Sequence, residues 1–302
     1  MLRYSSPSTF AGKARALREL LATEKPLIMP GVFNGISALA AEAAGAKAIY
    51  ISGAGVINGT AGYPDIGLLS MTEVAQQVRY IAGAVTVPGL ADADTGFGEG
   101  LLLSRTVQEL ERAGVAGVHI EDQQAPKRCG HLDGKTLVSR QDFVRRVRAA
   151  VRARGDANFV VCARTDARGV TGFDDAVDRA KACLDAGADL IFPEALTSEE
   201  EFARFAAAVD GPLLANMTEF GKTPLIAADR FAELGYVAVI FPMTGFRLAL
   251  RAMREGYAEL LASGTQAALL PRMDTRAQLY DLLRYAEYEQ VDAELAGKEG
   301  EL

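Results

Sequence analysis

The sequence predicts an α/β fold, a (β/α)8 barrel of the TIM type, with an extra N-terminal helix and a C-terminal helical extension. Two observations predict it. Short apolar runs alternate with amphipathic segments, and a segment that ends in a small or apolar residue plus Gly is repeatedly followed at once by such a run. These junctions are Ala44-Gly45, Ala113-Gly114, Ala186-Gly187 and Leu234-Gly235. Because a left-handed Gly closes a helix, each junction indicates a helix followed by a buried strand.

Eight apolar runs can be assigned as strands, and eight is the number that closes this barrel. In chain order they are Pro26–Met29, Ala48–Ser52, Val87–Ala91, Gly117–Glu121, Phe159–Ala163, Leu190–Pro193, Leu213–Ala215 and Val237–Phe241. A doubly wound open sheet alternates in the same way, but it often carries a Gly-rich phosphate turn after its first strand. Residues 30–35, which follow the first run, lack that fingerprint.

Helix starts occur after the strands, as the barrel requires. Three pairs have the Ser/Thr-x-x-acid spacing of a capping box: Ser70 with Glu73, Ser139 with Asp142, and Thr197 with Glu200. Two further helical segments, near Thr9–Ala22 and Thr275–Leu295, lie outside the eight units. We expect a single domain, residues 1–302, in which residues 271–302 form the C-terminal extension.

Composition excludes several functional classes. The chain has 302 residues, 49% hydrophobic and 24% charged, which suits one large domain. A net charge of -7 without a basic run argues against a nucleic-acid partner. The sequence has no apolar run of the roughly 20 residues that a membrane span requires and no signal-peptide core, so we expect a cytoplasmic protein. Its three widely spaced cysteines indicate neither a disulfide framework nor a structural zinc site.

Acidic residues end two adjacent predicted strands, where the active sites of such barrels lie. Asp92 and Asp94 are two apart on a segment expected to be extended, so they should point the same way, and Glu121 ends the next strand. Three converging carboxylates without a set of His or Cys favour Mg²⁺, or Mn²⁺, over zinc. Solvated acids at helix N-termini are the alternative, which is commoner for a single Asp than for such a cluster.

Residues 126–135 follow the fourth strand and are rich in Gly and charge, which predicts a mobile loop. Cys129 in this loop lies among cations, with His131 nearby. Because cations lower the pKa of a thiol, we expect an exposed Cys129 that reacts or donates a proton. A free surface cysteine is the alternative.

Other strand ends carry groups that suit a substrate with several carboxylates. Arg164 is costly to bury unless it meets an anion, either a substrate carboxylate or a neighbouring acid. The tight turn expected at residues 52–55 exposes N–H groups that could hold a carboxylate or carbonyl oxygen. Asn216 and Thr218 could hydrogen-bond a second carboxylate, and Glu194 could hold them in place or transfer a proton.

Two rival aldolase chemistries lack their residues. A Schiff-base aldolase needs a Lys on a barrel strand, and none of the eight runs contains one. A zinc aldolase needs several His ligands, whereas the chain has two His in all. A hard divalent cation, anion-binding groups and a positioned acid remain, which favours an enzyme acting on a small di- or tricarboxylate.

Six segments match a known pattern: Asp92–Gly98, His119–Gln123, Lys127–His131, Ala163–Ala167, Phe192–Ala195 and Asn216–Gly221. Through them, from about Pro26 to Tyr288, the chain resembles the isocitrate lyase and phosphoenolpyruvate mutase superfamily, most closely its 2-methylisocitrate lyases. Lys-Arg-Cys-Gly-His at 127–131 is the signature of the lyase branch.

The resemblance implies roles for individual residues. Asp94 would bind Mg²⁺ directly, and the residues that hold the ion through waters would be Asp65, Asp92 and Glu121. Cys129 would protonate the departing carbanion, and Tyr50 would take part in proton handling. The implied substrate-binding set is Ser52, Gly53, Ala54 and Arg164 at a pyruvate end, Glu194, Asn216 and Thr218 at a succinate end, and Gly130 and His131 of the signature. Related barrels often have Gly at the position of Ala54, whose methyl group would tighten the pocket.

The implied reaction is cleavage of 2-methylisocitrate to pyruvate and succinate, as in the methylcitrate cycle of propionate catabolism. Isocitrate and 2,3-dimethylmalate are alternative substrates. Oxaloacetate decarboxylases and phosphonomutases share the barrel without the Cys-Gly-His loop, and a non-catalytic metal-binding barrel has no support in the residues. Similar enzymes are homotetramers that exchange a C-terminal helix, which would give the Thr275–Leu295 segment a partner.

Overall fold

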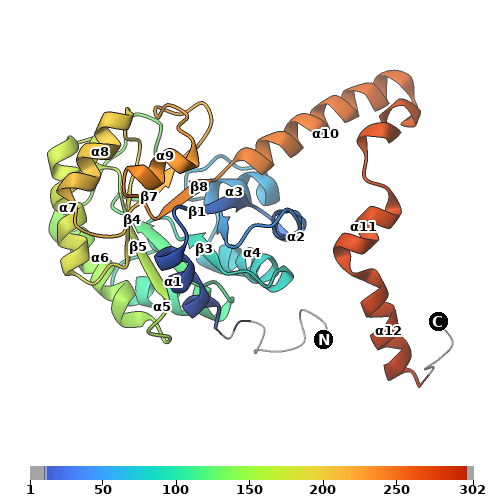
Figure 1. The fold of residues 1–302 in the computed structure, drawn as a ribbon, viewed down its shortest axis with the longest axis horizontal. Helices are drawn as coiled ribbons and strands as arrows, with labels where there is room; N and C mark the ends of the chain where they lie inside the picture. The colour runs from blue at the N-terminus through green and yellow to red at the C-terminus, as the bar shows by residue number, and fades with distance from the viewer. Residues whose placement is uncertain (1–9, 11, 298–302) are drawn as a thin grey trace. The chain divides into compact units, whose positions relative to one another are not determined.

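The computed structural model describes residue 10 and residues 12–297 of the chain, and its parallel strands form a nearly closed barrel with helices between them (Figure 1). The strands are β1 (Leu27–Val32), β2 (Ile49–Ile51), β3 (Gly89–Asp92), β4 (Gly117–Glu121), β5 (Val160–Thr165), β6 (Leu190–Pro193), β7 (Leu214–Asn216) and β8 (Ala238–Phe241). They are hydrogen-bonded in the order β6-β5-β4-β3-β2-β1-β8-β7. A parallel bridge between Ile191 and Leu213 links the two ends of this sheet. The predicted barrel and its eight predicted strands are confirmed.

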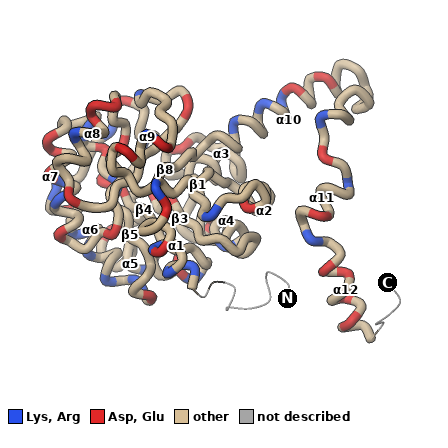
Figure 2. The backbone as a smooth tube through the Cα atoms, viewed as in Figure 1, with Lys and Arg blue, Asp and Glu red and all other residues tan. Residues whose placement is uncertain are grey.

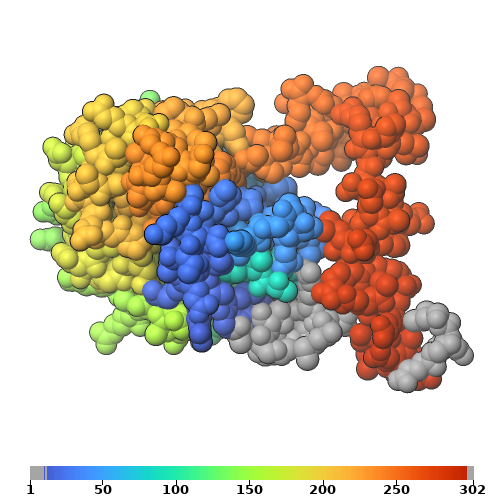
Figure 3. Space-filling view, viewed as in Figure 1, coloured from blue at the N-terminus to red at the C-terminus, as the bar shows by residue number. Residues whose placement is uncertain are grey.

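Helices follow the strands in the predicted alternation. They are α1 (Lys13–Thr23), α2 (Gly35–Ala43), α3 (Gly53–Ala61), α4 (Met71–Ala84), α5 (Leu101–Arg112), α6 (Arg140–Ala153), α7 (Phe173–Asp185), α8 (Glu199–Ala208), α9 (Ala228–Glu233), α10 (Thr244–Ser263), α11 (Arg276–Leu283) and α12 (Tyr285–Leu295), with 3-10 turns η2 (Ala167–Gly169) and η3 (Ala267–Arg272). Helix α1 is the predicted N-terminal helix, although the predicted start at Thr9 lies outside the described residues. In the space-filling view the N-terminal helices, in blue, form part of the surface of the barrel (Figure 3).

Two of the three predicted helix caps are confirmed. Ser70 and Glu73 form a reciprocal capping box at α4, and the Ser139 hydroxyl accepts a hydrogen bond from the Asp142 N–H at α6. The prediction for α8 was wrong by one residue, because Ser198 is the N-cap and accepts from the N–H of Glu201. The adjacent Thr197 offers the same chemistry, so the spacing rule alone could not choose between the two.

The inward-facing positions of the strands are apolar in the middle of the barrel and polar at its C-terminal end. Interior positions recur every second residue, and the inner apolar layer includes Leu90, Cys162, Phe192 and Leu214. The residue two positions after each of these faces inward as well, and it is polar. The pairs are Leu90 with Asp92, Cys162 with Arg164, Phe192 with Glu194, and Leu214 with Asn216. The strands therefore deliver these four side chains to one end of the barrel.

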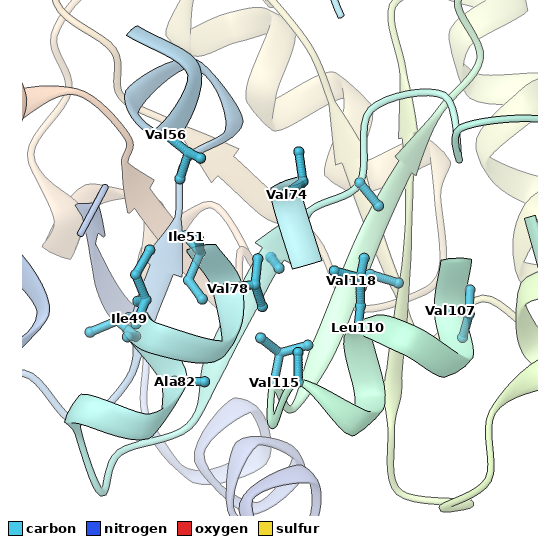
Figure 4. Packing of buried hydrophobic residues seen from close by; sticks show 14 of the residues in the cluster. Ile49, Ile51, Val56, Val74, Val78, Ala82, Val107, Leu110, Val115 and Val118 are labelled. Carbon is cyan, nitrogen blue, oxygen red and sulfur yellow. The ribbon is translucent and has the colours of Figure 1, made fainter. Parts of the chain in front are cut away.

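The outer faces of the strands pack against the helices. In Figure 4, Val78 of α4 lies near Ile51 of β2, and Leu110 of α5 lies near Val118 of β4. All four side chains are at most 2% exposed. Each buried aliphatic side chain of this kind contributes about 1.5–3 kcal/mol relative to an exposed one, so this layer holds the barrel frame that positions the mouth.

By its internal contacts the chain divides into two compact units, and the barrel unit spans Phe10–Phe246. The described part of the other unit is residues 247–297, so its boundary lies within α10, whereas the sequence placed the start of the extension at residue 271. The single helical segment predicted at Thr275–Leu295 is two helices, α11 and α12. Arg284 between them has a left-handed backbone with φ 57°, which ends α11.

Charged residues of both signs are spread along the chain, as the composition indicated. Acidic and basic residues alternate along the backbone of the barrel unit, whereas α12 carries acidic residues only (Figure 2). Within residues 10 and 12–297, no helix combines the length and apolarity needed to cross a bilayer.

Candidate active site

A cavity of about 60 Å³ lies at the polar end of the barrel and gathers most of the predicted site residues. Those that line it are Tyr50, Ser52, Ala54, Asp65, Asp92, Cys129, Gly130, His131, Arg164, Glu194, Asn216 and Thr218. The remaining three do not line it. Gly53 backs onto Asp92, Asp94 contacts Lys127, and Glu121 is buried beside Arg164.

Four carboxylates, here called the acid cluster, lie near a lysine that the sequence analysis did not assign to the site. They are Asp65, Asp92, Asp94 and Glu121. The ammonium of Lys127 is ion-paired with Asp65 and lies 2.7 Å from Asp94 Oδ1. The predicted geometry of Asp94 was wrong: β3 ends at Asp92, and Asp94 has φ 47° instead of an extended backbone. The two acids still meet, because the Asp94 N–H donates to Asp92 Oδ1 at 2.9 Å. A left-handed turn, not strand alternation, brings them together.

The donor chemistry of this cluster fits a hard divalent cation. Both carboxylate oxygens of Glu121 and Oδ1 of Asp94 are buried without a hydrogen-bond partner. Each residue has an ion pair instead, Glu121 with Arg164 at 3.4 Å and Asp94 with Lys127 at 2.7 Å. Burial, partly offset by Lys127, raises the pKa of Asp94 to about 6. A dication would relieve this concentration of negative charge. Among the described residues, no three His, Cys, Asp or Glu side chains are already grouped as metal ligands, and Lys127 is the cation at the cluster.

Tyr50 forms a buried polar contact at the floor of the cavity. Its hydroxyl lies 2.8 Å from His119 Nε2 and 3.4 Å from Asp92 Oδ2. Burial and the nearby Asp92 raise the pKa of Tyr50 well above its ordinary value, so the phenol stays protonated. Burial lowers the pKa of His119 to about 4, so this imidazole is neutral. Tyr50 is therefore a hydrogen-bond donor at neutral pH.

Arg164 is surrounded by acidic side chains. Of the two partners expected from the sequence, a substrate carboxylate or a neighbouring acid, the structure shows the neighbouring acids. Its Nε donates to Asp166 Oδ2 at 3.0 Å, and its terminal nitrogen lies 3.2 Å from Glu194 Oε2. Burial opposes the charged form, but Asp166, Glu121 and Glu194 outweigh it and raise the pKa of Arg164 well above its ordinary value. The guanidinium is a permanent cation at the cavity wall.

Residues 52–55 form the N-terminus of α3, where the sequence analysis expected a free tight turn. The Ser52 hydroxyl is the N-cap and accepts from the Gly55 N–H at 3.1 Å. The first intrahelical bond is Val56 N–H to Ser52 O, so the N–H groups of Gly53 and Ala54 precede the hydrogen-bonded ladder. Such N–H groups favour an anion. A Cβ on Gly53 would stand 2.6 Å from Asp92 Oδ2, so only glycine allows this approach.

The loop at residues 126–135, here called the flap, is pinned at its base. Gln123 forms an antiparallel bridge with Leu137, and its side-chain amide binds Arg128 at both backbone N–H and C=O, at 2.9 and 2.8 Å. Arg146 of α6 supports this base by donating to the carbonyls of Glu121 and Gln123. The flap is thus a closed hairpin over the cavity.

The tip of the flap contacts Glu194 through His131. The His131 Nδ1 accepts from the Lys222 N–H at 2.9 Å, which places the imidazole proton on Nε2, 3.1 Å from Glu194 Oε1. Asn216 Nδ2 also lies 3.3 Å from Glu194. Burial acts to raise the pKa of Glu194, but Arg164 and His131 outweigh it and hold that pKa well below its usual range. Glu194 is therefore a fixed carboxylate and not a proton donor.

A family model described as phosphoenolpyruvate phosphomutase matches residues 17–261. The chain belongs to this family. It is 53% identical to a 2-methylisocitrate lyase of Aeropyrum pernix over 95% of this chain and 92% of that one. The crystal structure of a 2,3-dimethylmalate lyase superposes with a TM-score of 0.90 at 38% identity, covering 96% of this chain and 98% of the other. That of an oxaloacetate acetylhydrolase gives 0.89 at 34% identity, covering 96% and 99%.

The environment of Cys129 in this family member differs from the predicted one. Burial raises the pKa of its thiol above the ordinary value, and the opposing hydrogen bond from the His131 N–H is weaker. The prediction of a lowered pKa was wrong because the nearby cations are engaged elsewhere: Lys127 with acids, and the exposed Arg128 with the carbonyl of Asp133. The thiol is half-buried and protonated, which suits a proton donor.

Several residues that shape the site of this phosphomutase-family barrel were missed by sequence reasoning. Phe192, Ile240, Pro242 and Met243 give the cavity an apolar wall. Lys127 is the first residue of the signature at 127–131, and this was the only sequence signal for its place in the site. Lys135, at the other end of the flap, is 2% exposed in its side chain, which no sequence pattern indicated.

Proposed function

We propose that this protein is a carbon–carbon lyase that cleaves 2-methylisocitrate to pyruvate and succinate. The observation that carries the proposal is the protonated, half-buried thiol of Cys129 on a closed flap, lining the same cavity as Arg164 and Asn216. Cleavage of such a substrate leaves a carbanion that needs a proton in a site closed to water. The relatedness to a 2-methylisocitrate lyase at 53% identity supports the substrate.

Two ends of the cavity suit the two products. The Gly53 and Ala54 N–H groups and the Arg164 guanidinium would hold the carboxylate and carbonyl of the pyruvate part. Asn216 and Thr218 at the end of β7 would hydrogen-bond the succinate part. Glu194 holds Asn216 and His131 in place through its contacts. A substrate carboxylate would join the acids around Arg164, which keeps its hydrogen bonds to Asp166.

The proton steps follow from the protonation states of Cys129 and Tyr50. Cys129 donates its proton to the carbon that leaves, because its raised pKa keeps the proton on sulfur until the bond breaks. When the C–C bond breaks, the substrate hydroxyl becomes the pyruvate carbonyl and must lose its proton. The Tyr50 phenol donates to Asp92 Oδ2 at 3.4 Å, so its oxygen takes the proton of the substrate hydroxyl while its own proton passes to Asp92. His119 Nε2, at 2.8 Å, holds the phenol in place. Closure of the flap excludes water, so the carbanion receives its proton from the thiol.

We further propose that Mg²⁺, or Mn²⁺, binds at the acid cluster, with Asp94 as the direct ligand and Asp65, Asp92 and Glu121 holding it through waters. Bound there, the ion would polarise the substrate oxygen and neutralise the charge that develops on it. The oxygens of Glu121, which have no hydrogen-bond partner and only a 3.4 Å ion pair with Arg164, support this assignment. Lys127 would have to leave the cluster as the ion arrives.

Substrate entry requires the flap to move. The cavity of about 60 Å³ is much smaller than the roughly 300 Å³ at the lower end of ordinary ligand pockets. Lys127 and the flap fill the missing volume. The structure therefore represents a closed flap, and we propose that opening precedes binding.

A 2,3-dimethylmalate lyase is the second candidate, favoured by the TM-score of 0.90. In its substrate a methyl group replaces the carboxymethyl group of 2-methylisocitrate, and the apolar wall of Phe192, Ile240 and Met243 would suit that methyl group. Ala54 also lines this cavity. Both candidates use the same cleavage and the same thiol.

We also propose that the protein is a cytoplasmic homotetramer whose C-terminal helices are exchanged between neighbours. Ile28 on the outer face of β1 is 49% exposed, and it lines an apolar hollow of about 410 Å³ with Pro30 and Ala41. Helices α10, α11 and α12 have no buried residue of their own. Both surfaces would be covered in an oligomer. Sedimentation velocity tests the stoichiometry.

One assay tests the proposed activity. Pyruvate and glyoxylate release are measured in parallel from 2-methylisocitrate, isocitrate and 2,3-dimethylmalate, with Mg²⁺ and with chelator. We expect pyruvate from 2-methylisocitrate at the highest kcat/KM, and loss of release with chelator. Glyoxylate from isocitrate as the dominant product would overturn the substrate assignment, and pyruvate chiefly from 2,3-dimethylmalate would establish the second candidate. Cys129→Ser is the matched control.

A further inference from the structure

We propose that Lys135 is a positioning residue that fixes Cys129 and Arg164 relative to each other when the flap is closed. Its chemical purpose rests on the proposed lyase function, but its geometry does not. Lys135 ends the flap, and it belongs neither to the acid cluster nor to the cavity lining.

The ammonium group of Lys135 joins Gly130 of the flap to Asp166 of the barrel. Lys135 Nζ donates to the backbone carbonyl of Gly130 and, at 2.8 Å, to Oδ1 of Asp166. The Lys135 side chain is 2% exposed and that of Asp166 is fully buried. Water cannot replace either contact while the flap is closed.

Asp166 is the carboxylate that also orients Arg164. The Arg164 Nε donates to its Oδ2 at 3.0 Å, and a terminal nitrogen donates to its Oδ1 at 3.2 Å. The backbone N–H of Asp166 is in turn fixed by Asp122 Oδ1 at 2.9 Å. Oδ1 of Asp166 thus accepts from both Lys135 and Arg164, so the flap and the anion-binding guanidinium share one anchor.

The hydrogen bond from Lys135 to the Gly130 carbonyl fixes the backbone next to the Cys129 thiol. Gly130 follows Cys129 directly, and a Cβ on Gly130 would stand 2.4 Å from Arg164 and from the Cγ of Glu194. The backbone here therefore lies directly against the cavity wall. Holding the Gly130 carbonyl sets the position from which the Cys129 thiol addresses the substrate.

The two other lysine contacts of the flap cannot substitute for this one. Lys127 holds the flap through Asp65 and Asp94, which are the carboxylates proposed to bind the dication, so cation binding and this contact compete. The ion pair of Lys222 with Asp133 is on the surface, where Asp133 is 91% exposed, and such pairs contribute little. Lys135 is the buried ammonium contact of the flap that persists when a dication occupies the cluster, and the buried contact of His131 with Glu194 persists with it.

The competing explanation is that the Lys135–Asp166 ion pair only stabilises the fold. The reactivity of the Cys129 thiol distinguishes this explanation from a positioning role. Cys162 and Cys183 are fully buried, so alkylation by iodoacetamide reports Cys129, with Cys129→Ser as the blank. We expect Lys135→Ala to raise the rate of Cys129 alkylation by about tenfold or more, because the flap tip is released. The matched control is Lys47→Ala, which removes an exposed ammonium that is also 2.8 Å from a carboxylate, Glu24. It should leave the rate unchanged.

Steady-state kinetics give the second readout. In Lys135→Ala we expect kcat to fall by about 100-fold, the loss typical of a misplaced reacting group, while KM changes by less than about threefold. Ethylammonium, which replaces the missing end of the side chain, should restore part of kcat and slow alkylation again. Tetramethylammonium at equal ionic strength should do neither, because it cannot donate hydrogen bonds.

The outcomes separate this proposal from the proposed function. Faster alkylation in Lys135→Ala, reversed by ethylammonium, supports the positioning role even if no tested substrate is cleaved. Unchanged alkylation and kcat in a variant with native circular dichroism overturn it. Lys135→Met, which keeps the apolar stem, is the second variant. If both variants are unfolded at the assay temperature, Lys135 stabilises the barrel and the positioning role is rejected.

Discussion

Gly130 of the flap lies against Arg164 so closely that a Cβ on Gly130 would stand 2.4 Å from a guanidinium nitrogen. Arg164 cannot retreat, because Asp166 and Glu194 hold it. Gly130→Ala should therefore keep the flap from closing and lower kcat/KM by about 100-fold, without a change in melting temperature. Gly35→Ala is the control, since its nearest neighbour would be 3.7 Å away. Wild-type turnover in Gly130→Ala would show that closure tolerates a methyl group.

Cys129→Ser should bind substrate with near wild-type affinity and lose most turnover. Serine keeps the size and the hydrogen bond to the His131 N–H, but its hydroxyl is a much weaker acid than a thiol. Isothermal titration of the product analogue oxalate measures binding, and pyruvate release measures turnover. A variant with unchanged kcat would remove the thiol from the reaction.

The pH dependence of Cys129 alkylation checks its environment. Burial raises the pKa of the thiol above its ordinary value of 9.0, so the neutral form is favoured in the folded protein. The alkylation rate should therefore keep rising through pH 9 and level off only above it, since thiolate is the nucleophile. A midpoint below pH 8 would mean that neighbouring cations dominate over burial.

Asp94→Ala should abolish cation binding at the acid cluster. The variant removes the proposed direct ligand, so the dissociation constant for Mg²⁺ should rise by more than the roughly 10- to 100-fold that loss of an outer ligand contact costs. Titration calorimetry with Mg²⁺ alone measures this, without turnover. Asp178→Ala on the exposed face of α7 is the control, because that carboxylate pairs only with exposed Arg140 among the contacts described. Equal affinity in both variants would exclude Asp94 as a ligand.

Phe202→Ala should destabilise the barrel by about 3–5 kcal/mol. Phe202 is 1% exposed, and its ring makes edge contacts with Phe231 at 4.9 Å and Tyr236 at 5.4 Å between centroids. Its loss leaves a cavity that these two rings cannot fill. Urea unfolding followed by fluorescence measures the free energy of unfolding. Leu225→Ala, at a residue that is 75% exposed, should change it by less than about 0.5 kcal/mol.

The barrel and the membership of its mouth were predictable because they depend on local patterns. A small or apolar residue plus Gly precedes four of the strands, and apolar runs of three to five residues mark all eight, so the strand ends fall at one rim. Cys129, Arg164 and Asn216 were brought to one cavity as expected.

The finer geometry depended on contacts between distant residues. The left-handed turn at Asp94 follows from packing around Lys127, 33 positions further along the chain, which no local rule reports. The pKa of Cys129 depends on where Lys127 and Arg128 point, not on their adjacency in sequence. Burial of Lys135 follows from its contact with Asp166 across the barrel mouth.

The antiparallel bridge between Gln123 and Leu137 has an energetic consequence for the whole catalytic cycle. Since both ends of the flap are already joined, opening and closing never create or dissolve a long loop, and the entropy of bringing distant ends together is settled once, when the chain folds. Each catalytic cycle orders only the short flap between Gln123 and Leu137, whose positions are fixed by their bridge. A handful of polar contacts at the tip is then enough to drive the motion in one direction and weak enough to release it in the other.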